Sequence, residues 1–243
     1  MIRPLLVGTH QYEWATNIFA YLFNKYWGTE PITYVSDRQV HPLYCNLEFM
    51  QVPCYTEGEW PWAHWFGHGL RSIFEHFAKD LIVLFLPDHW ITRPVDKDAV
   101  IAMAVYMDAH PHLVRGDLTA GQAVYSYGHQ IATSGGYGVW AVSPNHKHAS
   151  LNGGITFPPS LWNPVEALDI IEDTWSLHDC EKLGTQKMQR QTALYSAAIS
   201  PAPIHRAHVL HHAQQRVMNL TDVNPEDIPV IKECLPKDWG IIE

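Results

Sequence analysis

Hydrophobic runs alternate with amphipathic stretches through the first part of the chain. Apolar runs that end at Gly8, span residues 31–37 and span residues 81–86 have the length and composition of buried strands. Between them, apolar side chains recur at helical spacing over residues 13–28 and 62–80. Strands that alternate with helices in this way predict an α/β domain with a mostly parallel sheet.

The second half of the chain continues with shorter elements. A helix is expected from Pro94 to the stop at His110–Pro111, followed by a strand in "HLVRGDLT". Residues 121–150 are rich in Gly, Ser and Tyr, which predicts hairpins or flexible loops. Residues 163–189 are expected to be helical in two pieces that break near Glu172.

Composition limits the classes of protein that this chain can belong to. Hydrophobic residues make up 47% and charged residues 17% of the 243 residues, which is enough for a large core. The formal net charge is −9 and no run of Lys or Arg occurs, so sequence-independent binding to a polyanion is disfavoured. The four cysteines have no metal or redox spacing, and no apolar run is long enough to span a bilayer, so we expect a cytoplasmic protein with reduced thiols.

The strand at residues 81–86 ends at an unusual polar sequence, Pro87-Asp88-His89-Trp90. Ligands of open parallel sheets gather at the carboxyl ends of the strands, so Asp88 is well placed to hold a divalent metal or a substrate hydroxyl. The alternative is that Asp88 only caps a turn.

The sequence "LIVLFLPDHWITRPVD" resembles a segment of nucleotide-sugar glycosyltransferases with the GT-A fold. In that family an apolar strand ends in acidic residues, whose carboxylates hold Mn or Mg against the diphosphate of the sugar donor. The resemblance implies a GT-A-like three-layer α/β/α domain and assigns Asp88 to the donor and its metal. The sequence departs from the pattern, because Pro87 replaces a first acid and His89 follows Asp88 as a possible second ligand. Such a site would favour Mn over Mg, or the metal could be lost.

A second segment, "IIEDTWSLHDCEKLG", resembles the acidic pair of inverting GT-A enzymes, which opens a helix that closes with a glycine. An acceptor hydroxyl must lose its proton as it attacks the anomeric carbon, and a carboxylate can take that proton. The resemblance makes Asp173 the first choice for this base, beside Glu172. Asp179 and Glu181 are alternatives on the same expected helix. The other alternative is an acidic helix start that the helix dipole favours and that has no catalytic role.

The same resemblance covers roughly residues 1–215 and suggests further contacts with the ligands. Trp162 lies where the family places an aromatic near the sugar or acceptor, after Gly153 and Gly154. The loop with Thr9, His10 and Tyr12 lies where the family contacts the nucleotide base or ribose. We therefore expect a single domain over residues 1–243. Its nucleotide-sugar-binding half spans about 1–115, its acceptor and catalytic half about 116–215, and its tail 216–243.

Histidines are numerous, and several have the spacing of metal ligands. His205, His208 and His212 are expected on one face of a helix, with His211 adjacent, so two of them could join a third ligand in a zinc or manganese site. A solvated or aromatic-packed helix face is the favoured alternative. His64 and His68 have i, i+4 spacing without the glutamate of a zinc protease, and are expected on a helix surface.

The sequence therefore predicts a glycosyltransferase that uses a nucleotide-diphospho-sugar, with inversion. The acceptor could be a glycan, a lipid-linked molecule, a small metabolite or a modified nucleic-acid base. Two other classes stay open. One is a non-catalytic module of the same fold that binds a sugar or nucleotide, and the other is a metal hydrolase in which His205, His208 and His212 converge with Asp88.

Overall fold

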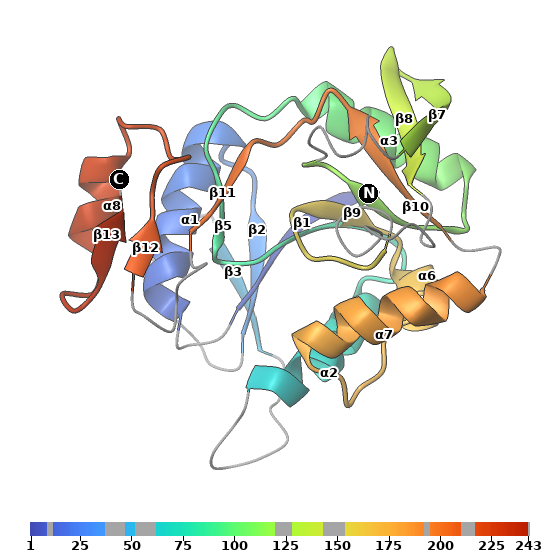
Figure 1. The fold of residues 1–243 in the computed structure, drawn as a ribbon, viewed down its shortest axis with the longest axis horizontal. Helices are drawn as coiled ribbons and strands as arrows, with labels where there is room; N and C mark the ends of the chain where they lie inside the picture. The colour runs from blue at the N-terminus through green and yellow to red at the C-terminus, as the bar shows by residue number, and fades with distance from the viewer. Residues whose placement is uncertain are drawn as a thin grey trace. The chain divides into compact units, whose positions relative to one another are not determined.

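The structure is a computed structural model that describes residues 1–8, 12–36, 47–51, 62–119, 128–142, 154–191, 195–209 and 217–242. The chain forms two compact units, each built from segments that are not contiguous in sequence. Unit 1 contains residues 1–3, 52–84 and 97–203, and unit 2 contains residues 4–51, 85–96 and 204–243. Both units combine strands and helices (Figure 1), which confirms the predicted α/β class.

The N-terminal strands form a parallel set in unit 2. They are β1 (Ile2–Val7), β2 (Ile32–Ser36) and β3 (Leu47–Gln51), in the order β3-β2-β1. The crossover from β1 to β2 is helix α1 (Glu13–Tyr26), which is the βαβ arrangement that the apolar pattern predicts. The turn after α1 requires Gly28, whose φ of 135° suits a residue without a Cβ.

Aromatic side chains fill the core of unit 2 along one side of α1. Phe19 and Phe23 both contact Phe85, with ring centroids 5.2 and 6.0 Å apart, and Trp27 meets the same ring at 5.7 Å. These side chains are almost completely buried, and edge-to-face aromatic contacts add to the stabilisation from apolar burial.

The C-terminal part of unit 2 adds two small sheets and a helix. Strand β5 (His89–Ile91) pairs antiparallel with β11 (Arg206–His208). Strand β12 (Val217–Asn219) pairs parallel with β13 (Gly240–Ile242), and helix α8 (Ile228–Cys234) precedes β13. The strand β11 corrects one prediction, because residues 206–208 do not belong to a helix. The predicted helix through His205 and His208 is therefore wrong, and His211 and His212 lie outside the described part of the chain.

A buried carboxylate joins α8 to α1 within unit 2. Asp227 is completely buried and accepts hydrogen bonds from Lys25 Nζ (2.6 Å), Tyr26 Oη (2.6 Å) and Tyr21 Oη (3.0 Å). The neighbouring Glu226 is exposed and lies 3.8 Å from the same lysine nitrogen. This carboxylate attaches the C-terminal helix to the N-terminal helix.

The strands of unit 1 follow the order β4-β9-β6-β10-β8-β7. They are β4 (Leu81–Phe85), β6 (Leu113–Asp117), β7 (Gly128–Ser134), β8 (Tyr137–Val142), β9 (Ser160–Trp162) and β10 (Tyr195–Ser200). Strand β9 pairs antiparallel with both β4 and β6, whereas β10 is parallel to β6. The predicted hairpin region contains β7 and β8, which turn at Gly135 and Gly136, both with positive φ.

The helices of unit 1 cover both faces of these strands. Successive strand residues point to opposite faces. Gly116 faces α3 (Lys97–Ala109), where Met103 would lie 2.8 Å from an added Cβ. Trp162, which pairs with Arg115, packs against Phe74 of α2 (Trp62–His76). Helices α6 (Pro164–Leu168) and α7 (Leu177–Arg190) pack with α2, so unit 1 has helix, sheet and helix layers (Figure 1).

The helix that contains the predicted catalytic acids begins later than the sequence suggested. Glu172 and Asp173 lie in the connection between α6 and α7, and α7 begins at Leu177. Ser176 caps it through a capping box with Asp179, and the helix continues past Gly184 to Arg190. The predicted break near Glu172 is confirmed, but the acidic pair does not open the helix.

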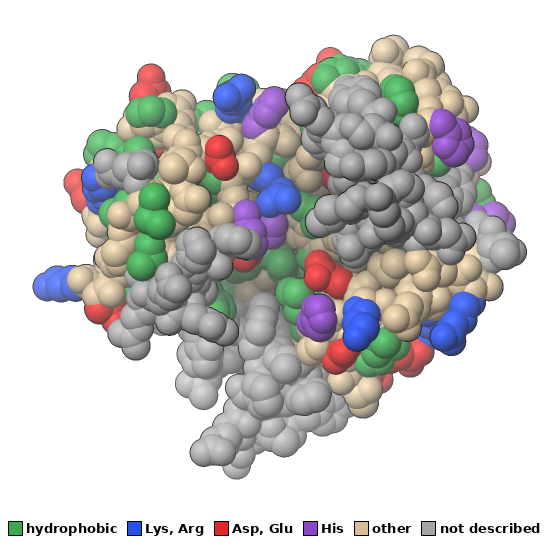
Figure 2. Space-filling model, in the orientation of Figure 1, with side chains coloured by type: hydrophobic (Ala, Val, Ile, Leu, Met, Phe, Trp, Pro, Cys, Tyr) green, Lys and Arg blue, Asp and Glu red, His purple; other side chains and the backbone are tan. Residues whose placement is uncertain are grey.

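The described helices include none that is long and apolar enough to cross a membrane. Figure 2 shows one face of the molecule, on which Lys and Arg side chains are scattered among acidic side chains and histidines. On that face the described basic side chains do not gather into one patch.

Candidate functional site

The turn after β4 places Asp88 through three local contacts. The backbone N–H of His89 donates to Leu86 O (3.1 Å), and the buried Trp90 donates its indole N–H to Pro87 O (2.7 Å). Pro87 itself packs on Gly8, where an added Cβ would lie only 2.7 Å from Pro87 Cγ. Pro87 and Trp90 therefore fix the conformation of the turn. Asp88 and His89 are the residues of the turn whose side chains can bind a ligand or a metal.

Strand β11 brings a second histidine to this turn. The antiparallel pairing of β5 with β11, called the β5–β11 ribbon below, places His208 directly opposite His89. Their rings stack with centroids 4.7 Å apart and planes 5° from parallel. His208 Nε2 lies 3.1 Å from Asp88 Oδ2. The backbone of the turn is also bound to this segment, because the N–H of Val209 donates to Asp88 O at 3.0 Å. Asp88, His89 and His208 therefore form one cluster, in which three possible ligand atoms lie within 4.8 Å of one another.

Arg206 completes the cluster, and sequence reasoning did not select it. Its Nη1 lies 2.8 Å from His89 Nδ1, and because arginine can only donate, the imidazole nitrogen accepts this hydrogen bond. The alternation of polar Arg206 and His208 with buried Ala207 and Val209 is a strand signal. That alternation could have placed both polar side chains on one face.

The electrostatics of the cluster follow from burial and from the opposite charges within it. Burial lowers the pKa of His89 to about 3; Asp88 opposes this change, and Arg206 and His208 add to it. Burial works to raise the pKa of Asp88, but the two histidines beside it outweigh that effect and the pKa is lowered. His89 is therefore neutral and Asp88 ionised at neutral pH.

Tyr12 is the described member of the predicted nucleotide loop. Burial raises the pKa of its phenol, and the negative charge of Asp88 raises it further, which places Tyr12 within electrostatic range of the cluster. Thr9 and His10 lie outside the described residues, so their predicted contacts with base or ribose stay predictions.

Asp173 lies in unit 1, on a turn that is held against α2. Its Oδ1 is 3.4 Å from both His68 Nδ1 and Arg71 Nε. Arg71 also donates to Leu168 O and Ile171 O, each at 2.7 Å. The turn can come this close because residue 67 is glycine, and an added Cβ there would lie 2.2 Å from Glu172 O.

His68 was expected on a helix surface, but it is only 19% exposed and reaches the predicted base. Its other ring nitrogen, Nε2, lies 3.5 Å from Ser72 Oγ. Asp173 remains 62% exposed, so its carboxylate is open to solvent as well as to these two partners. The side chain of His64 lies outside the described residues.

The other acidic candidates are engaged differently. Glu172 forms an ion pair with Lys187, and Asp179 is bound to Ser176 in the capping box of α7. Glu181 lies on α7, half-buried. Asp179 thus has a structural task that Asp173 does not share, and the assignment of the base among the four acids stays a prediction.

Trp162 is a core residue of unit 1. It is fully buried and packs on Phe157 and Phe74, with ring centroids 5.5 and 5.8 Å away. Its indole N–H has no hydrogen-bond partner among the described residues. Its predicted contact with a sugar or acceptor stays a prediction. Gly154 is described and accepts a 3.5 Å hydrogen bond from the buried Arg115, whereas Gly153 is outside the described part.

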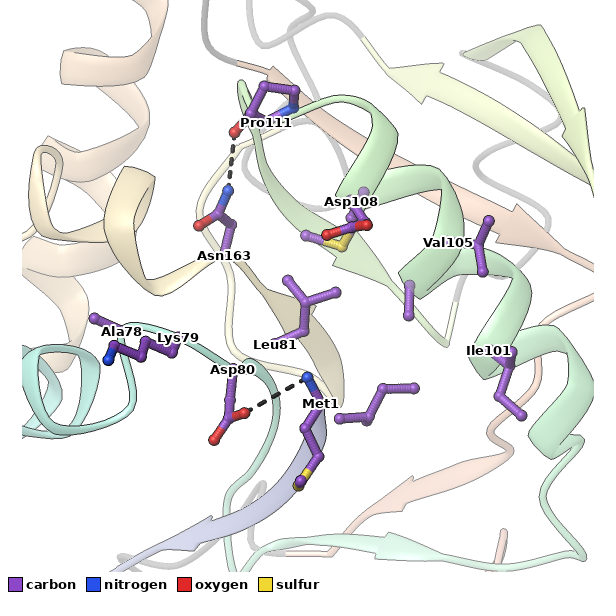
Figure 3. Close-up of a pocket in the computed structure, with 13 residues that line it drawn as sticks. Met1, Ala78, Lys79, Asp80, Leu81, Ile101, Val105, Asp108, Pro111 and Asn163 are labelled. Carbon is purple, nitrogen blue, oxygen red and sulfur yellow. Dashed lines mark hydrogen bonds and ion pairs between the residues drawn. The ribbon is translucent and has the colours of Figure 1, made fainter.

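A groove of about 440 Å³ lies elsewhere in unit 1, at the start of β4 (Figure 3). Apolar side chains of Leu81, Ile101 and Val105 line much of it. Two carboxylates, Asp80 and Asp108, also line it, and Asp80 is bound to the Met1 amino group and to Arg3. Ligands of α/β sheets gather at the carboxyl ends of strands, so this groove at an amino end is a poor candidate for the site.

Comparison with known proteins shows the fold of the chain. No protein-family model and no curated protein matches the sequence. Among solved structures, S. aureus TarS 1-349 matches with a TM-score of 0.51 and 12% identity, over 95% of this chain and 62% of the TarS chain. UTP-bound UGPase from Acinetobacter baumannii gives 0.47 and 11%, over 98% and 95% of the two chains. UDP-glucose pyrophosphorylase from the same organism gives 0.45 and 13%, over 86% and 88%. The chain thus has the α/β fold of TarS while spanning 62% of that chain's length.

Proposed function

We propose that the protein is a glycosyltransferase that moves a sugar from a nucleotide-diphospho-sugar to a hydroxyl acceptor, with inversion. The observation that carries the proposal is the cluster of Asp88, His89 and His208. It follows the apolar strand β4, in the segment whose sequence resembles the donor-binding segment of GT-A glycosyltransferases. The fold shared with TarS agrees with this assignment but does not extend it to an activity.

In this proposal the cluster binds the donor. Asp88 is 24% exposed and ionised, so it can accept a hydrogen bond from a sugar or ribose hydroxyl or neutralise a cation. Tyr12, near the same carboxylate, supplies a half-buried aromatic ring and a hydroxyl for the nucleotide. The cation that faces the diphosphate is either a bound Mn or Mg ion or a side chain of the cluster, and the hydrogen bonding of His89 bears on that choice.

Asp173 is proposed as the general base. An acceptor hydroxyl loses its proton as it attacks, and an exposed carboxylate on a fixed turn can receive that proton. Three contacts limit the movement of the turn: the two Arg71 bonds to backbone carbonyls and the donation from Gly67 N–H to Trp175 O at 2.9 Å. His68 and Arg71 hold the carboxylate through their side chains.

The proposal is tested with a panel of UDP-, GDP-, ADP- and CDP-sugars, with and without Mn. Thermal shift identifies the donor that binds, and release of the nucleoside diphosphate then measures turnover. We expect one nucleotide class to raise the melting temperature, and Asp88→Asn to remove that response. Asp98→Asn, which changes an exposed carboxylate of α3, is the matched control and should keep it. If no nucleotide sugar binds, the proposed function is wrong.

The same assay separates the two alternative functions. A non-catalytic module of this fold would bind the nucleotide sugar without releasing a nucleoside diphosphate. The metal hydrolase needs His205, His208 and His212 to converge with Asp88, and His212 lies outside the described residues. The contact between His208 and Asp88 does exist, so zinc content after purification remains the test of that class.

A further inference from the structure

The hydrogen bond between Arg206 and His89 fixes which ring nitrogen of His89 carries a proton. Arginine has five N–H donors and no acceptor, so the 2.8 Å contact requires a lone pair on His89 Nδ1. A neutral imidazole has one lone pair and one N–H, which places the proton on Nε2. That nitrogen faces Asp88, at 3.9 Å from Oδ1.

The ribbon of β5 and β11 enforces this arrangement. His208 pairs directly with His89, and Arg206 pairs with Ile91 two residues further along. Residues two apart on a strand share a face, so Arg206 lies diagonally across from His89 on the same face as His208. The short contact is therefore built into the strand register.

This hydrogen bond is the reverse of what a metal-ligating histidine needs. A ligand histidine binds the ion through one nitrogen and donates its other N–H to a carboxylate or carbonyl. Here the second nitrogen of His89 meets a cationic donor, and the nitrogen that faces Asp88 carries the proton. His89 could bind an ion through Nε2 only by losing the Arg206 hydrogen bond and bringing an N–H toward the guanidinium. The predicted ligand role of His89 therefore does not fit the cluster.

Without His89, the donor set is a poor one for Mg or Mn. Among the described residues of the cluster, one carboxylate and one imidazole remain, and His208 Nε2 is already 3.1 Å from Asp88 Oδ2. Hard divalent ions prefer several oxygen ligands. A guanidinium, by contrast, offers a planar fork that matches phosphate oxygens.

We propose that Arg206 is the cation that binds the donor diphosphate, so that the site works without a divalent metal. The inference rests on the proposed function for the identity of the ligand. In this arrangement His89 orients the guanidinium by accepting its hydrogen bond. Asp88 binds no metal and can accept a hydrogen bond from a hydroxyl of the donor. Arg206 is half-buried, as a residue that meets both the ribbon and a ligand must be.

The first test uses inorganic pyrophosphate, which has no base or sugar, and calorimetry on the full chain. We expect the wild-type protein to bind pyrophosphate equally well with EDTA and with Mn. Arg206→Met should weaken binding at least tenfold, whereas Arg93→Met, which changes an exposed arginine of unit 2, should stay within about twofold. Binding that is lost in EDTA and restored by Mn would overturn the inference, and this comparison needs no variant to fold.

The second test uses the metal alone. Wild-type protein should take up no stoichiometric Co²⁺, measured by its visible absorption. Arg206→Met frees His89 Nδ1 and should create a Co²⁺ site that a further His208→Ala change removes. Stoichiometric, Asp88-dependent Co²⁺ or Mn²⁺ binding by the wild-type protein refutes the inference. Failure of the proposed function is distinguishable, because it removes every nucleotide-sugar response while these metal results stay as expected.

Discussion

The buried Asp227 allows the attachment of helix α8 to be tested quantitatively. Asp227→Ala removes an acceptor that is completely buried and receives three hydrogen bonds, from Lys25, Tyr21 and Tyr26. Its neighbour Glu226 contacts the same lysine at 3.8 Å but is 79% exposed. Glu226→Ala is therefore a matched control that removes a carboxylate without opening the core.

The magnitude follows from what each partner loses. Removing one member of a buried ion pair costs about 3–5 kcal/mol. The side chain of Lys25 is 32% exposed and can regain water, and Tyr26 Oη keeps a hydrogen bond from Asn224, so the lower end applies. We expect Asp227→Ala to lose about 3 kcal/mol of unfolding free energy. Glu226→Ala should lose no more than about 0.5 kcal/mol, because exposed ion pairs contribute little.

Urea denaturation followed by far-UV circular dichroism measures both values. With a slope of about 3 kcal/mol per molar urea, Asp227→Ala should move the midpoint down by about 1 M. Glu226→Ala should leave the midpoint within about 0.2 M of the wild-type value. Equal shifts in the two variants, or no shift in Asp227→Ala, would show that the buried carboxylate does not attach α8 to α1.

Three further predictions concern the candidate site. Asp88→Asn should cost donor turnover severely while the urea midpoint stays near wild type; full transfer activity in this variant would exclude Asp88 from the donor site. Asp173→Asn should lower the transfer rate by roughly two to four orders of magnitude while donor binding is kept. Asp179→Asn should instead cost about 1 kcal/mol of stability, because Asp179 belongs to the capping box of α7. Loss of transfer in Asp179→Asn and not in Asp173→Asn would assign the base to Asp179. His89 has a folded pKa of about 3, below its unfolded value of 6.5, so its contribution to stability is complete above pH 6.5 and is lost as the pH falls. Between pH 7.5 and 5.0 this contribution should fall by about 2 kcal/mol in the wild type and not in His89→Gln, and equal losses in both proteins would contradict the low pKa.

The elements of the fold that sequence reasoning located correctly carry their signal locally. Residues 81–85 form a strand because five consecutive large apolar side chains suit burial on both faces, and α1 forms because its apolar residues recur at helical spacing. The start of α7 is also encoded locally, because Ser176 and Asp179 have the spacing of a capping box. The prediction instead began the helix at Asp173, four residues before its observed start at Leu177.

The candidate site was only partly predictable because its geometry depends on partners distant in sequence. Asp88 and His89 were selected from their position after a buried strand, and this part needed no tertiary information. The spacing of His208 from His205 and His212 predicts a helix, but the pairing of His208 with His89 makes residues 206–208 a strand. The alternation over residues 206–209 could have placed Arg206 on one face with His208, but its contact with His89 Nδ1 depends on the register between β5 and β11. Local spacing cannot encode such a contact.

Biosynthesis faces a particular difficulty at the β5–β11 ribbon. Asp88 and His208 are separated by 120 positions, so at roughly 5–20 residues per second the ribosome makes His208 about 6–24 seconds after Asp88. During that interval β5 has no strand on the edge that β11 later covers, and an unpaired edge can bind other chains. Closing a loop of this length costs roughly 4 kcal/mol of chain entropy. Nascent chains that are stalled before residue 206 should therefore aggregate more than chains that are stalled after β11 has left the ribosome.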